Sequence, residues 1–251
     1  MIQLKNELQI SEMKKAGRIT AEAMFAAAEK IREGVSTYEL DKVVRHHIER
    51  CGARPTFLGY NGFPGSACIS VNDEVIHGIP SRDRILHEGD IVKLDLGAFW
   101  HGFTGDMART FAVGSISAEA QRLIDVTKLC FERGCENFVN GKRIGDIGSA
   151  VQTCAESAGY SVVTKYVGHG VGHELHEDPE VPNYGRPGRG IRLETGMTLA
   201  IEPMINAGVP DVFVMPNGWT VKTSDGRLSA HYENSVALTR EGPVILTAVY
   251  D

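Results

Sequence analysis

Cysteine is scarce in this chain, and its cysteines are not arranged in pairs. The sequence has five cysteines in 251 residues and contains no C-x-x-C motif. A disulfide framework uses an even number of cysteines and a zinc finger uses closely spaced pairs, so the sequence indicates neither. Reduced thiols are typical of the cytoplasm, which is where we expect this protein.

Long apolar runs and an excess of positive charge are also absent. No stretch approaches the roughly 18 apolar residues of a membrane span, and the first residues lack the apolar core of a secretory signal. The net charge of -6 gives no basic surface for nucleic acid or for an anionic membrane. We therefore expect neither of these as a partner.

The motifs of three large enzyme classes are missing. The sequence has no G-x-S-x-G motif, which argues against a serine nucleophile. The glycines at 62–65 and 168–172 fit neither the dinucleotide fingerprint nor the P-loop, so no nucleotide cofactor is expected. Residues 173–176 read H-E-L-H, which is one residue short of H-E-x-x-H, and we reject a zincin.

An internal repeat sets the expected architecture. When residues 34–95 are laid over residues 141–202, the offset is 107 residues throughout and no gap is needed. Three glycines match three glycines, and Asp95 matches Glu202. A duplicated half-domain is the simplest explanation, and chance matching of common glycines is the alternative.

We predict a single domain over residues 1–251, with half-repeats at roughly 10–113 and 118–251, because 42% hydrophobic content suffices for one substantial core. Helical patterns occupy residues 11–31, 37–50, 118–138 and 144–157, and strand patterns occupy residues 67–71, 91–99, 162–166, 198–205 and 235–239. The predicted fold class is α/β of the α+β type, in which helices cover one face of a curved, mainly antiparallel sheet.

Five residues able to bind metal lie in short motifs whose other letters are mostly glycine or apolar. They are Asp95, Asp106, His169, Glu202 and Glu233. Asp95 and Glu202 lie in runs typical of buried strands, where an unpaired carboxylate is unfavourable. A pseudo-two-fold axis would bring these two acids together, and a hairpin in each half would return Asp106 or Glu233. Four carboxylates and an imidazole suit two divalent ions, so hydrolysis is the first hypothesis.

Several other polar residues have simpler explanations. Asp106 alone would be read as a turn cap after Gly105, and Cys68 as a small strand residue. We interpret five further histidines as solvated or core residues, namely His46, His47, His87, His101 and His231. The 30 residues between Glu202 and Glu233 predict a long loop beside the pocket, with Asp211, Trp219 and Asp225 at its border.

Seven short motifs, taken in order, resemble those of the type I methionine aminopeptidases, the compact bacterial form within peptidase family M24. They lie at residues 72–80, 95–97, 105–110, 168–172, 176–179, 201–204 and 232–233. The resemblance covers nearly the whole chain. It implies the pita-bread fold, which is itself a pseudo-two-fold duplication and agrees with the repeat.

The resemblance implies that the five residues named above bind two divalent ions, with Asp106 and Glu233 bridging them. Mostly oxygen ligands favour Mn, Fe or Co, and Zn is also compatible. By the same likeness, a hydroxide held between the metals attacks the scissile carbonyl, which His176 helps to polarise. Glu202 moves protons, and His77 contacts the scissile nitrogen.

The family's methionine pocket maps onto Tyr60, Phe63, Cys68 and Trp219, with His77 and His176 also binding substrate. The implied activity is removal of the N-terminal methionine from nascent proteins whose second residue is small and uncharged. Transient contact with the ribosome and a monomeric state are further expectations. Two departures from the family pattern are Asn234, where histidine is frequent, and Leu175, where phenylalanine is frequent.

Two other readings compete with this one. A proline-specific aminopeptidase or dipeptidase of the same superfamily would use the same five ligands, but it usually carries an additional N-terminal domain. A pita-bread protein that has lost activity and serves as a binding module is the second alternative. Such a loss should remove metal ligands first, and all five are present.

Overall fold

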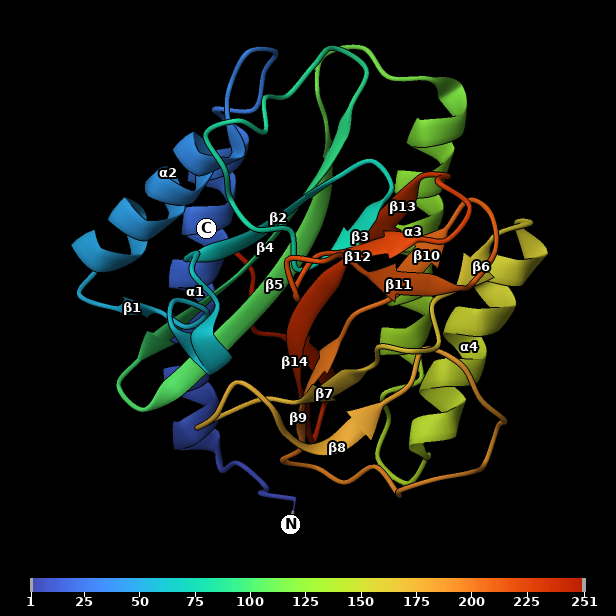
Figure 1. Cartoon of the computed structure of the whole chain (residues 1–251). Coiled ribbons are helices and arrows are strands. Elements are labelled where there is room, and N and C mark those ends of the chain that lie inside the picture. Colours follow the sequence, from blue (N-terminus) through green and yellow to red (C-terminus); the bar gives the residue numbers. More distant parts are fainter. Residues whose placement is uncertain (1, 250–251) are drawn as a thin grey trace.

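A computed structural model describes residues 2–249 and shows two pairs of long helices on either side of a set of antiparallel strands (Figure 1). The helices are α1 (Glu7–Ala28), α2 (Thr37–Arg50), α3 (Ala118–Glu136) and α4 (Ile144–Ser157), with a short 3-10 helix, η1 (Tyr60–Gly62). The strands of the first half are β1 (Arg54–Pro55), β2 (Ala67–Val71), β3 (Glu74–Ile76), β4 (Ile91–Trp100) and β5 (Phe103–Ala112). The later strands are β6 (Ser161–Val162), β7 (Gly168–Gly170), β8 (Glu177–Val181), β9 (Thr198–Ile201), β10 (Met204–Asn206), β11 (Val212–Val214), β12 (Val221–Thr223), β13 (Ser229–His231), β14 (Glu233–Thr239) and β15 (Gly242–Ile245).

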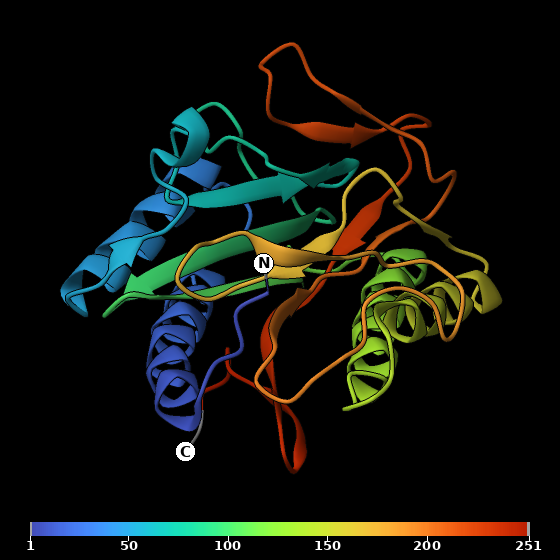
Figure 2. The ribbon, with the colours of Figure 1, turned by 90° about the horizontal axis from the view of Figure 1, so that it is seen from below.

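The main sheet has nine strands and joins the two halves of the chain. Its order is β1-β4-β5-β14-β9-β7-β8, with β2 paired to β4 and β15 paired to β14, and all the pairings are antiparallel. Two small three-stranded sheets, β13-β10-β6 and β11-β12-β3, lie beside it. Seen from below, the two helix pairs stand on opposite sides of these strands (Figure 2). The predicted α+β class with a mainly antiparallel sheet is confirmed.

The helices begin where side chains satisfy their free N–H groups. In α1 the Asn6 side chain accepts from the Gln9 N–H, and the Gln9 side chain accepts from Asn6 in return. This capping box starts the helix at Glu7, so the predicted start at residue 11 was wrong. Within residues 2–249, no helix combines the length and the apolar character needed to cross a membrane.

Helix α1 packs unusually closely on the hairpin of β4 and β5. An ideal Cβ on Gly105 would lie 2.6 Å from the Cα atom of Gly17, so only two glycines permit this approach. The Thr20 hydroxyl donates to the Gly105 carbonyl at 3.2 Å and accepts from the Ala98 N–H at 3.1 Å. Both strands of the hairpin are therefore fixed to one turn of the helix.

The structure repeats itself at the offset seen in the sequence. Both ends of α4 follow those of α2 by 107 residues. Ahead of α2, the Gly34 N–H donates to the Leu86 carbonyl at 2.9 Å, and ahead of α4 the Gly141 N–H donates to the Leu193 carbonyl at 2.9 Å. Both glycines adopt left-handed backbone, with φ of 85° and 89°. Matching hydrogen bonds at matching positions are not expected from chance alignment of glycines.

Two predicted strands differ from those observed. The predicted strand at 198–205 is two strands, β9 and β10, which belong to different sheets. Pro203 lies at the break because it has no N–H to donate to a neighbouring strand. The predicted strand at 162–166 is reduced to β6, which pairs with β10 through Val162 and Ser161 only.

We expect Gly17→Ala to destabilise the protein even though alanine favours a helix over glycine by about 1 kcal/mol. The new Cβ would lie 2.3 Å from the Leu246 carbonyl oxygen, and backbone cannot move aside cheaply. The free energy of unfolding should fall by about 2 kcal/mol, as in overpacked cores, which urea denaturation measures.

Gly134→Ala in α3 is the matched control. There the nearest atom to the new Cβ is a Val151 side-chain methyl at 2.9 Å, which can rotate away. Its cost should be well below that of Gly17→Ala, and equal costs for the two variants would contradict the close approach of α1.

Candidate metal centre

The register of the central strands places three acids on one face of the sheet. Asp95 in β4 lies opposite Ala108 in β5, and Ala108 lies opposite Glu233 in β14. Asp106 is two residues before Ala108, so the alternation of side chains along a strand returns it to the same face. The hairpin of β4 and β5 thus converges Asp95 and Asp106 on Glu233, which comes from the other half of the chain.

The second half adds two more residues to this face. Ala200 in β9 lies opposite both Ser235 in β14 and His169 in β7. Glu202 lies two residues after Ala200 and Glu233 two residues before Ser235, so both side chains point to the same face of the sheet as His169. The His169 Nε2 atom is 3.3 Å from Glu202 Oε1 and 3.7 Å from Asp106 Oδ2. The five predicted metal ligands thus lie together.

The carboxylates of this cluster resist ionisation. Burial raises the pKa of Asp106 to about 7. Burial, and after it the neighbouring acids, raise the pKa values of Asp95, Glu202 and Glu233 well above the usual range. Burial lowers the pKa of His169 to about 3, so its ring is neutral and does not compensate the acids. A cation held among these groups would relieve both their desolvation and their mutual repulsion.

The donor atoms fit a divalent metal ion. One ligand atom each from Asp106, His169 and Glu233 lie within 4.8 Å of one another. The Asp106 Oδ1 atom is buried without a hydrogen-bond partner. The His169 Nδ1 atom is 2.9 Å from the Gly170 carbonyl, so Nδ1 carries the ring proton and the Nε2 lone pair faces the acids. Oxygen-rich ligands with one imidazole suit Mn, Fe or Co.

Two further histidines stand at the rim of the cluster. His176, between β7 and β8, lies 2.7 Å through Nδ1 from the Tyr60 hydroxyl, and its ring centroid is 4.2 Å from that of His169. His77 follows β3 in left-handed backbone, with φ of 58°. Burial is the main cause that lowers the pKa of His77 to about 4, and burial also lowers the pKa of His176. Both rings are neutral at pH 7.

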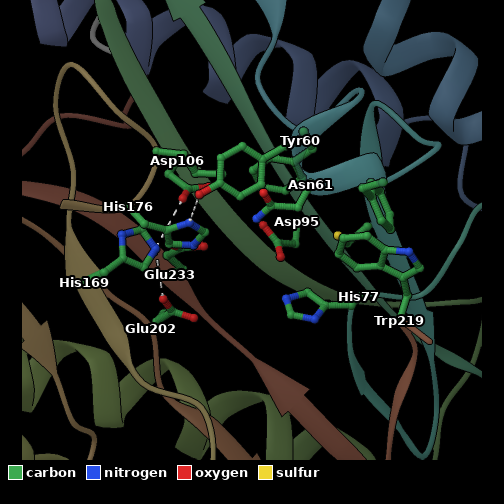
Figure 3. A pocket seen from close by; sticks show the side chains of 14 residues that line it. Tyr60, Asn61, His77, Asp95, Asp106, His169, His176, Glu202, Trp219 and Glu233 are labelled. Atoms are coloured by element: carbon green, nitrogen blue, oxygen red, sulfur yellow. Dashed lines mark hydrogen bonds and ion pairs between the residues drawn. The ribbon is translucent and has the colours of Figure 1, made fainter. Parts of the chain in front are cut away.

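These groups line one side of a cavity whose other side is an apolar wall. Figure 3 shows the acids and His169 on one side and the Trp219 ring on the other. Phe63 packs edge to face on Trp219 at 5.1 Å, and Cys68 completes the buried wall. The volume is about 210 Å³, below the roughly 300–1,000 Å³ of pockets for drug-sized ligands. The cavity is therefore too small for a large ligand.

All the predicted site residues line this single cavity, and the structure adds residues that the sequence did not reveal. Asn61 and Phe57 also line it. His231, assigned to the solvated or core histidines, is buried, and its Nε2 atom lies 3.5 Å from Glu202 Oε2. Its position two residues before Glu233 was the available signal.

The prediction of which residues of the long loop border the pocket was partly wrong. Trp219 lines the cavity, but Asp211 and Asp225 do not. Asp225 instead accepts from the Val209 N–H at 2.8 Å and so closes a turn of the loop. The 30-residue segment is also less irregular than expected, because it forms β10, β11, β12 and β13.

The two departures from the family pattern have different places. Leu175 is buried in the cavity wall with Phe63 and Cys68. The Asn234 side chain lies outside the cavity, where its Oδ1 atom accepts from Arg109 at 2.7 Å and from the Thr247 hydroxyl at 3.0 Å. Asn234 therefore links the start of β14 to Arg109 and Thr247 outside the cavity.

Comparison with known proteins agrees with this geometry. A model described as metallopeptidase family M24 matches residues 11–240. A methionine aminopeptidase of Clostridium acetobutylicum is 53% identical over 247 residues, which cover 98% of this chain and 99% of that protein. Methionine aminopeptidase 1 of Bacillus subtilis is 46% identical over 249 residues, covering 99% of this chain and 100% of that protein.

Solved structures show the same relationship. A methionine aminopeptidase from Thermotoga maritima superposes with a TM-score of 0.97 at 41% identity, covering 99% of this chain and 100% of that one. A prolidase from Pyrococcus furiosus has a TM-score of 0.80 at 26% identity, covering 99% of this chain and 66% of that one. The predicted pita-bread fold is confirmed, and the proline-specific relatives are the more distant ones. The chain belongs to metallopeptidase family M24, among its methionine aminopeptidases.

Proposed function

We propose that this enzyme removes the N-terminal methionine from peptides whose second residue is small and uncharged. The observation that carries the proposal is a small cavity with the five candidate metal ligands on one side and an apolar wall of Phe63, Cys68 and Trp219 on the other. Substrates would be nascent proteins, met in the cytoplasm by a monomer in transient contact with the ribosome.

Asp95, Asp106, His169, Glu202 and Glu233 would hold two divalent ions, with Mn, Fe or Co preferred and Zn compatible. When bound, such ions supply Lewis acidity, which lowers the pKa of water and polarises a carbonyl group. The chain's own contribution is to hold four acids together, so that they favour a multivalent ion over protons.

His176 is placed to donate a hydrogen bond to the scissile carbonyl oxygen. Burial, first among its causes, raises the pKa of the Tyr60 hydroxyl, which therefore stays protonated and donates to His176 Nδ1. The proton of the neutral His176 ring then lies on Nε2, the atom free to face the substrate. Tyr60 thereby selects the tautomer that stabilises developing negative charge on the carbonyl oxygen.

Glu202 and His77 would act on the leaving side. Burial and the neighbouring acids raise the pKa of Glu202, which suits it to accept a proton and return it to the departing amine. His77 lies between Trp219 and the acids and is placed to contact the scissile nitrogen. A bulky second residue would clash near these groups, which explains the expected preference for small ones.

Release of free methionine from Met-Gly-Met-Met, with and without Mn or Co, tests the proposal. Metal-dependent release of only the first residue supports it. Cleavage of an Ala-Pro dipeptide in place of this peptide would favour the proline-specific alternative. Absence of cleavage together with absence of bound metal would favour a binding module.

We expect His176→Ala to lower kcat by about 100-fold, the scale for loss of one hydrogen-bond donor to a developing oxyanion. His173→Ala is the matched control, because His173 lies in the same turn and is exposed, with its Nδ1 atom 2.9 Å from the Gly102 carbonyl. Its kcat should remain within about twofold of the original enzyme. Equal losses in both variants would show that the turn, and not the His176 ring, is what matters.

We also predict that metal binding stabilises the fold more strongly at pH 8 than at pH 6.5. Because the pKa of Asp106 is raised to about 7, it carries a proton in much of the metal-free protein at pH 6.5 and has lost it at pH 8. Protons and metal compete for the same oxygens, so apparent Mn affinity should rise roughly fourfold over this range. Thermal unfolding at fixed free Mn, with and without chelator, measures it.

The variant Asp106→Asn serves as the control for that measurement. It removes one buried acid and one ligand, so the metal-free protein should be as stable as before or more stable, while the gain from Mn should vanish. A gain from Mn that persists in this variant, or that does not change with pH, would contradict the assignment of the ligands.

A further inference from the structure

The largest fully buried side chain outside the metal centre is a lysine. Lys93 in β4 is 1% exposed. Its Nζ atom donates to the Asn72 carbonyl at 2.6 Å and to the Ser229 carbonyl at 2.9 Å. Lysine is almost never fully buried without partners, and here two of its partners are backbone carbonyls from different halves of the chain.

These contacts close a triangle between three segments. The Ser229 N–H donates to the Asn72 carbonyl at 3.1 Å, so Asn72, Ser229 and Lys93 each contact the other two. Asn72 belongs to the turn before β3, Ser229 begins β13, and Lys93 lies in β4. Beside the triangle, the Thr110 hydroxyl donates to the His231 carbonyl at 2.9 Å and accepts from the His231 N–H at 2.9 Å, which holds β13 against β5.

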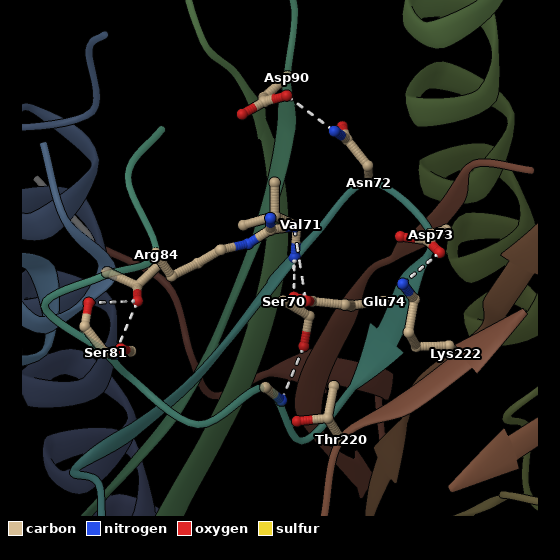
Figure 4. A network of polar contacts seen from close by, with 12 residues as sticks. Ser70, Val71, Asn72, Asp73, Glu74, Ser81, Arg84, Asp90, Thr220 and Lys222 are labelled. Carbon is tan, nitrogen blue, oxygen red and sulfur yellow. Dashed lines mark hydrogen bonds and ion pairs between the residues drawn. The ribbon is translucent and has the colours of Figure 1, made fainter. Parts of the chain in front are cut away.

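The turn that carries Asn72 is itself fixed in place. Asn72 has left-handed backbone, with φ of 55°, and its side chain accepts from the Ile91 N–H at 3.0 Å. Its side-chain nitrogen donates to Asp90 at 2.7 Å (Figure 4). The Asn72 carbonyl therefore has little freedom to find another donor.

Each of the three segments runs directly into the catalytic cavity. β3 ends one residue before His77, and β13 ends two residues before Glu233. Lys93 lies two residues before Asp95 in the same strand, so both side chains point to the same face of the sheet. A shift of any one segment against the others would change the distances among these three site residues.

We propose that Lys93 is a positioning residue, whose ammonium group sets the relative places of His77, Asp95 and Glu233 by binding the Asn72 and Ser229 carbonyls. This inference rests on the proposed function of the site. The Ser229 to Asn72 hydrogen bond does not involve Lys93, so loss of the ammonium group loosens the three segments without separating them.

The surroundings of Lys93 support a charged donor at this point. Burial lowers the pKa of Lys93 to about 7, and the carboxylates of Glu74, Asp73 and Asp90 oppose that change. The acids thus offset part of the desolvation cost of an ammonium group. An apolar side chain at this position would avoid that cost, but it would leave the Ser229 carbonyl without the Lys93 donor.

The test compares Lys93→Met with Lys222→Met in the Co-loaded enzyme. Lys93→Met keeps a long flexible side chain and removes the hydrogen-bond donors. Lys222→Met removes a partly exposed cation of β12 that pairs with Asp73, the residue after Asn72. We expect Lys93→Met to lower kcat about tenfold with KM within about twofold, and to change the visible absorption of bound Co. Lys222→Met should leave all three unchanged.

A Lys93→Met enzyme with unchanged kcat and an unchanged Co spectrum but a lower melting temperature would overturn the proposal, because Lys93 would then only stabilise the fold. If Lys93→Met does not fold, Lys93→Gln takes its place. The glutamine side chain keeps a donor, but its nitrogen is one bond closer to the backbone than the lysine nitrogen, so binding the same carbonyls would shift the three segments. Original values of kcat and of the spectrum in that variant would equally overturn it. Should the unaltered enzyme release no methionine, the proposed function fails, and the Co spectra still decide the positioning role.

Discussion

Mutual repulsion among four closely spaced acids is the constraint on which the rest of this structure depends. Two charges 4 Å apart repel by about 4 kcal/mol at the effective dielectric constant of a protein surface. Burial, and after it the neighbouring acids, raise the pKa values of Asp95, Glu202 and Glu233 well above the usual range. A flexible scaffold would let the acids separate into solvent. They stay together because they project from neighbouring strands of one sheet, where each strand is held by ladder hydrogen bonds on both sides.

The contacts that hold this sheet in place lie close to the acids. On one side, Gly17 and Gly105 let α1 approach the backbone next to Asp106, and Thr20 bonds both strands of the hairpin. On the other side, β13 is held over β4 and β5 through Lys93 and Thr110. Next to Glu233, the side chain of Asn234 accepts hydrogen bonds from Arg109 and Thr247. The rigidity needed by Asp95, Asp106 and Glu233 is therefore supplied by contacts close to each of them.

The sequence predicted much of this arrangement because its signals were local. The bounds of α2 and α4 and the meeting of Asp95 with Glu202 follow from the repeat, from capping and from apolar periodicity. The start of α1, the break at Pro203 and the strands between Glu202 and Glu233 were missed because they depend on short polar contacts and on which sheet a segment joins. The place of His231 could have been inferred from its position two residues before Glu233. The contacts of Lys93 join segments far apart in the chain, and no spacing along the sequence encodes them.

The pairing of β5 with β14, which joins the two halves of the chain, also affects how the protein folds during synthesis. Asp95 and Asp106 are made more than 120 residues before Glu233, and the first half has its own core of α1, α2, β2 and β4. N-terminal units of a growing chain generally fold first. The leading half thus emerges with the edge of β5 unpaired and two acids lacking their partners, an intermediate open to strand addition by other chains until β14 closes it. Pairing of β14 with β5 is consequently the step that brings Glu233 to Asp95 and Asp106 and also covers this edge.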